Sequence, residues 1–234
     1  MPTGHILETD KPEQRPLPDS AKLRRAAELF EETVKATLAL LREGKGVRES
    51  RPMAGVITYE FPPAPERLRL LLGDCFQSLR SALDHEVFAL TAARHGRIWA
   101  DQANTAFPIA ITAQAFKSQG LKQIRGLNAQ AQGLIGTLQP FQQPAHLLAP
   151  ALAFVHDVAR VDRHRLLNLA AVQPREVDFN QVSGRINLKV ELRFVLSEFS
   201  GRDALGEARS AIAVVAWTID ELRAAEKSEP AGKP

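Results

Sequence analysis

The chain has 234 residues, of which 44% are hydrophobic and 24% charged, as expected for a folded protein of one large domain. No apolar run approaches the roughly eighteen residues of a membrane span, and the start lacks the basic-then-apolar pattern of a secretory signal. We therefore expect a cytoplasmic protein with no membrane partner. The formal net charge of +3 is compatible with contact with nucleic acid but is too small to indicate it.

The N-terminal quarter predicts a tail, a helix and a strand. Residues 1–19 combine prolines with charges and predict a disordered tail. Apolar residues then recur at helical spacing up to about Arg42, after Asp19 or Ser20 as a potential N-cap, and Gly44 follows as a stop. Residues 55–61 are rich in β-branched and aromatic side chains, which favours a strand.

A second helix is predicted from Pro65 to about Arg94. Its apolar stripe continues from Leu68 to Leu90 at helical spacing. The single cysteine, Cys75, lies on this stripe, which predicts a buried and unreactive thiol.

In the middle of the chain we expect an irregular segment, a short helix and a longer helix whose apolar stripe contains a carboxylate. Residues 99–126 favour irregular structure and residues 127–138 a short helix, before a longer helix from about residue 151 to residue 169. Asp162 takes a position at which the apolar stripe of this helix should continue. A carboxylate there requires partners.

The C-terminal part predicts a hairpin and a last helix. Apolar and polar residues alternate over residues 185–194, which indicates an antiparallel strand, and residues 177–180 suit its hairpin partner. A helix follows over residues 205–222, and residues 227–234 resemble a disordered tail. The expected fold is a single α+β domain of residues 20–226, a helical bundle of about four to five helices with a small, mostly antiparallel sheet.

Two charged segments interrupt these helices and form the candidate site. The first is LRSALDH at residues 79–85, and the second runs through residues 156–165. Burying such groups costs free energy unless they meet partners. We therefore expect the two segments to meet in one cluster. The candidate catalytic residues are Arg80, Asp84, His85, Asp162, His164 and Arg165.

Together with other short motifs, these segments resemble a known family. The motifs are Gly73-Asp74, LRSALDH, Phe107-Pro108-Ile109, LQPF at residues 138–141, and a final segment from His156 to Leu167. In this order they resemble a widespread family of uncharacterised bacterial proteins, which is marked by an LRSALDH helix and a later LHxLxxxDKHR helix. Arg163 stands where a lysine is usual. The resemblance implies one site or one structural joint and no particular activity.

Three interpretations of the cluster remain open. In the first, the protein is a non-catalytic interaction or structural protein, and crossed ion pairs dock the two helices. Asp84 would pair with Arg165, and Asp162 with Arg80 or His85. Scattered basic residues of such a protein could face RNA or an acidic partner.

The second interpretation is a metal-independent ribonuclease. Arg80 and His85 satisfy the R-x4-6-H motif of HEPN-like ribonucleases, whose resemblance implies a histidine that moves a proton and an arginine that steadies the phosphate. Their spacing turns the two side chains about 140° apart on a regular helix. A homodimer, which could compose the site from two subunits, would relax that objection.

The third interpretation is a metal-dependent hydrolase, in which a divalent metal activates water. The candidate ligands are His85, His156, Asp157 and Asp162. The other interpretations require no cofactor. The sequence leaves open whether the protein is an enzyme.

Overall fold

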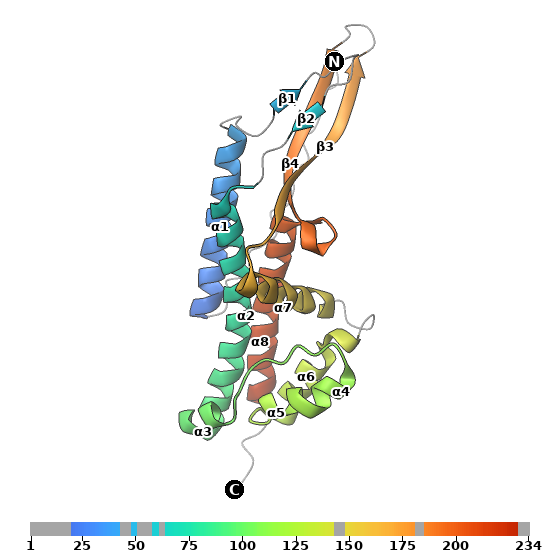
Figure 1. The fold of residues 1–234 in the computed structure, drawn as a ribbon. Coiled ribbons are helices and arrows are strands. Elements are labelled where there is room, and N and C mark those ends of the chain that lie inside the picture. The colour runs from blue at the N-terminus through green and yellow to red at the C-terminus, as the bar shows by residue number, and fades with distance from the viewer. Residues whose placement is uncertain are drawn as a thin grey trace, which may run out of the picture.

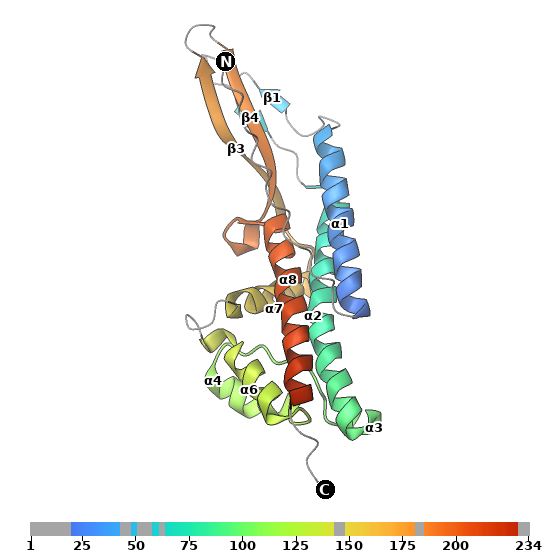
Figure 2. The same ribbon diagram turned by 180° about the vertical axis from the view of Figure 1, so that it is seen from behind.

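Three long helices lie side by side and form the body of the molecule (Figures 1 and 2). The computed structural model describes residues 20–42, 48–50, 58–60, 64–142, 148–180 and 185–228. The long helices are α1 (Ala21–Arg42), α2 (Glu66–His95) and α8 (Ala204–Ser228), and α7 (Ala149–His164) crosses them. The α+β helical bundle expected from the sequence is confirmed.

Helix α1 begins at a predicted N-cap, and α2 ends at a glycine. The Ser20 hydroxyl accepts a hydrogen bond from the Leu23 amide at 3.4 Å, as an N-cap does. Helix α2 ends before Gly96, whose φ of 88° lies in a region that favours glycine. The Cys75 thiol is buried and donates to the Ala26 carbonyl at 3.3 Å. Burial raises its pKa to about 12, as expected for an unreactive thiol.

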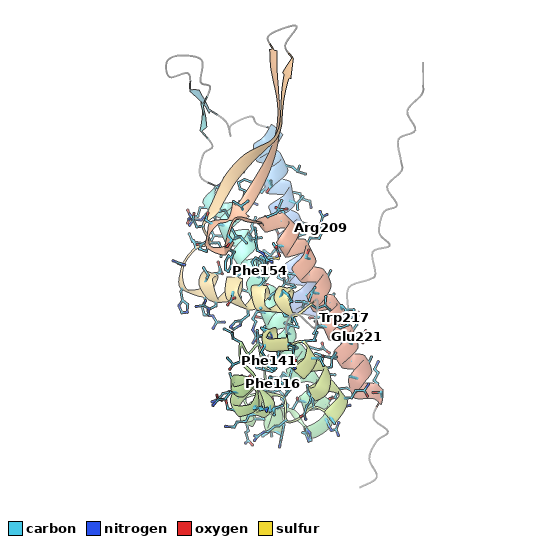
Figure 3. The ribbon with its side chains drawn as sticks, turned by 90° about the vertical axis from the view of Figure 1, so that its right-hand side faces the viewer. Phe116, Phe141, Phe154, Arg209, Trp217 and Glu221 are labelled. Atoms are coloured by element: carbon cyan, nitrogen blue, oxygen red, sulfur yellow. The ribbon has the colours of Figure 1, made fainter. Side chains whose placement is uncertain are left out.

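Residues 97–142, at the end of the bundle opposite the long hairpin, contain more helices than predicted. Most are too short to leave a periodic pattern in the sequence, so the expected count of four to five was too low. Phe116 and Phe141 pack here with ring centroids 5.9 Å apart (Figure 3). The elements are α3 (Arg97–Gln102), α4 (Ala113–Ala115), a π-helical turn η1 (Phe116–Gly120), α5 (Leu121–Gln123), α6 (Ala129–Thr137) and a 3-10 turn η2 (Pro140–Gln142).

Helix α7 ends five residues earlier than predicted, at His164 rather than residue 169. Arg165 is already extended, with φ of −164° and ψ of 152°. Leu167 is fully buried, and its carbonyl accepts a hydrogen bond from Arg69 Nε at 2.6 Å. Leu167 therefore contributes to the core from extended chain, although Leu166 and Leu169 also suit the helical spacing on which the prediction rested.

All described strands pair antiparallel. Strands β1 (Arg48–Ser50) and β2 (Thr58–Glu60) form one small sheet, and β2 lies within the strand predicted at residues 55–61. The second sheet has the order β3-β4-β5. Its long hairpin projects beyond the helices (Figure 1) and confirms the predicted pairing. These strands are β3 (Leu169–Asn180), β4 (Arg185–Leu196) and β5 (Arg202–Asp203), with a 3-10 turn η3 (Ser197–Phe199) before β5.

One cluster of buried apolar residues joins the long helices, α7 and the base of the hairpin. Phe154 of α7 contacts Phe76 of α2 and Phe199, with ring centroids 5.7 and 5.2 Å apart. No described helix has the length and apolarity to cross a membrane. Helix α8 continues to Ser228, two residues into the predicted C-terminal tail, while residues 1–19 and 229–234 lie outside the described residues.

Candidate functional site

Arg80 and Asp84 hold the backbone of Phe107 from both sides. They lie one helical turn apart on α2, and Arg80 Nη1 donates to Asp84 Oδ1 at 2.7 Å. Arg80 Nη2 donates to the Phe107 carbonyl at 2.8 Å, and the Phe107 amide donates to Asp84 Oδ1 at 2.9 Å. We call these three hydrogen bonds the Phe107 clamp. They satisfy both backbone polar groups of a residue whose side chain is fully buried.

Gln139 holds the residues that follow Phe107. Its buried side chain accepts from the Ala110 amide at 2.8 Å and donates to the Pro108 carbonyl at 3.0 Å. The LQPF segment and the Phe107-Pro108-Ile109 segment therefore meet, and the Phe107 clamp joins both to LRSALDH. Three of the motifs that carry the family resemblance form one structural joint.

His156 of α7 lies near the Phe107 clamp. Its ring is half-buried. Burial lowers the pKa of His156, and the nearby Arg80 guanidinium lowers it further, whereas the carboxylates of Asp157 and Asp84 act in the opposite direction. Arg80 and Asp84 of α2 therefore act electrostatically on His156 of α7, whereas Asp162 meets other residues of α2.

Asp162 meets α2 at a separate place, where Gly73 leaves room for its side chain. A Cβ at Gly73 would lie 1.9 Å from Asp162 Oδ1. Gln77 Nε2 donates to Asp162 Oδ2 at 3.5 Å and to the Ala159 carbonyl. Burial raises the pKa of Asp162; the Gln77 hydrogen bond lowers it, and the nearby Asp74 carboxylate raises it. The Gly73-Asp74 motif thus belongs to the crossing of α2 and α7.

The crossed ion pairs expected between the two helices do not form among the described residues. Arg80 pairs with Asp84 on its own helix. Asp162 has the amide of Gln77 as its partner. His164 and Arg165 are exposed at the end of α7. Between α2 and α7, Gln77 binds the Ala159 carbonyl and Asp162, and Phe76 packs against Phe154. A pattern of charged residues does not reveal these contacts.

His85 directly follows Asp84 of the Phe107 clamp on α2. It is exposed and lines an open cavity of about 610 Å³ together with Asp84, Lys22 and Arg97. Arg80 does not line this cavity. The predicted angular separation of Arg80 and His85 therefore holds, and within one chain the two residues do not face a common space.

A buried ion pair between α2 and α8 was missed from the sequence. Glu86 is 6% exposed, and both of its carboxylate oxygens accept from Arg223, each at 2.7 Å. Glu86 stands beside Val87 at helical spacing from both Leu83 and Leu90, so its position on the apolar face of α2 could have revealed it.

The described residues contain no group of three His, Cys, Asp or Glu side chains that could hold a metal ion. Of the candidate ligands, His85 and His156 lie in different surroundings, the first at the cavity and the second near Arg80. No protein-family model, curated protein or solved structure matches the chain.

Proposed function

We propose that this protein is a non-catalytic binding protein in which Arg80 and Asp84 maintain the architecture. The Phe107 clamp carries this proposal. Arg80 donates to Asp84 and to the Phe107 carbonyl, and its side chain is only 15% exposed. An arginine that steadies a phosphate must present its guanidinium to the ligand. Arg80 would have to leave two short hydrogen bonds to do so.

The other candidate residues support the same proposal because they are dispersed. Asp162 is held by Gln77, while His164 and Arg165 are exposed at the far end of α7. General acid–base catalysis needs its groups within hydrogen-bonding reach of one substrate. The arrangement instead suits a scaffold that fixes an extended segment between helices and offers its outer surface to a partner.

The test combines stability with ribonuclease activity. Arg80→Lys keeps the charge but cannot donate in the same forked geometry, so we expect the free energy of unfolding to fall by about 1 to 3 kcal/mol. Arg160→Lys is the matched control, because Arg160 is exposed and its contact with Asp157 is 3.9 Å long. Its stability should stay within about 0.5 kcal/mol of the wild type. Urea unfolding measures both variants, and RNA incubated with the wild type and a chelator should stay intact.

The opposite result would be metal-independent cleavage of RNA that leaves cyclic phosphate ends. If Arg80→Lys and His85→Ala each abolished that cleavage while the free energy of unfolding stayed unchanged, the architectural role of Arg80 would be wrong.

A ribonuclease is the second candidate, and the exposure of His85 favours it. His85 lines an open cavity that a phosphodiester could reach. In this alternative Lys22 or Arg97 would supply the positive charge in place of Arg80. Cleavage should then depend on His85 and on one of these two residues and not on Arg80. An HEPN-like site shared by two subunits predicts in addition a dimer in solution, which sedimentation measures.

A further inference from the structure

The His85 cavity lies where the beginning of α1 meets α2 and α3. Figure 2 shows the start of α1 beside α2, with α3 at the end of α2. Lys22 comes from the first turn of α1, His85 from α2 and Arg97 from the start of α3. Residues far apart in the sequence thus contribute three nitrogen donors to one open space of about 610 Å³. This volume falls within the usual range for small-molecule sites.

The acidic residues of this cavity already have their charges balanced. Glu86 is paired with Arg223 through two hydrogen bonds of 2.7 Å, and Asp84 is paired with Arg80 at 2.7 Å. Lys22 and Arg97 are exposed, and neither makes an ion pair within the described part of the chain. Within the described residues, the cavity therefore presents two positive charges, those of Lys22 and Arg97, beyond the ones that pair with Asp84 and Glu86.

Helix α3 is held firmly enough to place Arg97. Trp99 packs between His95, with ring centroids 4.5 Å apart, and the guanidinium of Arg125, which lies 5.4 Å from the Trp99 ring. Ala100 is fully buried, and its carbonyl accepts a hydrogen bond from Thr105 Oγ1 at 2.9 Å. A site on an anchored element loses less conformational entropy when it binds a ligand.

We propose that the His85 cavity binds a phosphate group, with Lys22 and Arg97 as its charged ligands and His85 as a further donor. The planar fork of arginine matches phosphate oxygens, and lysine adds a point charge. Two unbalanced cations suit the double negative charge of a phosphate monoester. The ligand is a phosphate carried by a free nucleotide or by RNA. The inference rests on the proposed binding function and names the chemistry of its ligand.

Isothermal titration of the full chain tests this proposal with three probes: inorganic phosphate, a nucleoside 5′-monophosphate and a short 5′-phosphorylated single-stranded RNA. We expect saturable binding that the double variant Lys22→Ala/Arg97→Ala weakens at least about tenfold. The matched control is Lys117→Ala/Lys122→Ala, which removes two exposed positive charges outside the cavity. This control should bind like the wild type. The probe with the lowest dissociation constant identifies the source of the phosphate.

If both double variants weakened phosphate binding equally, the proposal would be overturned, because the loss would then follow from the lower net charge and not from the cavity. The absence of saturable binding of all three probes by the wild type would overturn it as well. Neither result bears on the Phe107 clamp, whose test is the stability of Arg80→Lys. Failure of the phosphate site and failure of the architectural role of Arg80 are therefore distinguishable.

Discussion

His156 lies half-buried on α7, close enough to Arg80 and Asp84 for their charges to act on its ring. Burial and the Arg80 guanidinium favour the neutral imidazole, and Arg160 adds to this effect, while Asp157 and Asp84 oppose it. The uncharged ring can therefore lie beside Arg80 where α2 and α7 cross without electrostatic repulsion. Protonation would place another positive charge beside Arg80.

A lowered pKa in the native state has a definite consequence for stability. Between the native pKa and the ordinary value of 6.5, the unfolded chain binds more protons at His156 than the folded chain. This contribution to stability is fully present above the unfolded value and is lost as the pH falls towards the native one. His156→Gln should therefore show a weaker loss of stability than the wild type between about pH 8 and about pH 5, measured by urea unfolding.

His164→Gln is the control for this prediction, since it removes an exposed imidazole from the same helix. Its stability should depend on pH as that of the wild type does. If His156→Gln and the wild type lost stability in parallel, another group would be responsible for the acid sensitivity.

At the residue level, the sequence located the charged segments but not their partners. Arg80 and Asp84 are neighbours on one helix, so their pairing is predictable from a spacing of one turn. Their second partner is the backbone of Phe107, which is 27 residues from Arg80 and 23 from Asp84. Every residue has such backbone groups. The motifs did include Phe107-Pro108-Ile109 and LQPF, but no side-chain pattern indicated that the backbone of Phe107 would bind Arg80 and Asp84, or that Gln139 would bind the backbone of Pro108 and Ala110.

Among the elements, the crossing of α2 and α7 depends on the absence of a side chain at Gly73. Gly73 and Gln77 follow each other by one turn on α2, and Asp162 of α7 fits over them. Glycine in the middle of a helix is otherwise unfavourable by about 1 kcal/mol relative to alanine. Close approach of the Asp162 carboxylate explains its position.

Gly73→Ala tests this explanation in two backgrounds. In the wild type, the new Cβ meets Asp162 Oδ1, so we expect the free energy of unfolding to fall by about 1 to 3 kcal/mol. In an Asp162→Ala background the obstacle is gone, and the same replacement should raise the free energy of unfolding by up to about 1 kcal/mol. Thermal or urea unfolding of the four proteins of this cycle gives the coupling between the two positions.

Gly133→Ala on α6 is the matched helical control, because a Cβ there meets nothing within 4 Å. It should be neutral or stabilising whether or not Asp162 is present. A Gly73→Ala effect of the same size and sign in both backgrounds would show that Asp162 is not the obstacle.

The predictability of each element depends on its length. Helices α1, α2 and α8 contain several turns of apolar periodicity, and their predicted ranges agree with the structure except that α8 continues six residues beyond residue 222. Helices α4 and α5 have three residues each, which is less than one turn, so they leave no periodic signal. The predicted end of α7 was wrong because Leu166 and Leu169 continue the helical spacing, whereas the chain is already extended at Arg165 and buries Leu167 from that conformation.

At the scale of the whole molecule, the helices separate two regions. The His85 cavity lies towards the end that carries α3, and the long β3–β4 hairpin projects from the opposite end (Figure 1). The base of the hairpin contributes Leu169, Phe194 and Leu196 to the described core. The described core of the bundle is therefore built almost entirely from helices and from the chain between them.

This division predicts that the outer hairpin can be shortened without loss of the bundle. Val172 and Arg193 face each other in the antiparallel register, so residues 173–192 can be replaced by an Asn-Gly turn of two residues. The base residues and β5 keep their pairing. We expect one cooperative thermal transition by circular dichroism, with a midpoint within about 5 °C of the wild type, because about 1 kcal/mol shifts the midpoint of a chain this size by a few degrees. Loss of the cooperative transition would mean that the helices need the outer hairpin to fold. Retained stability together with retained phosphate binding would instead show that the bundle and its cavity form a unit to which the outer hairpin adds a separate surface.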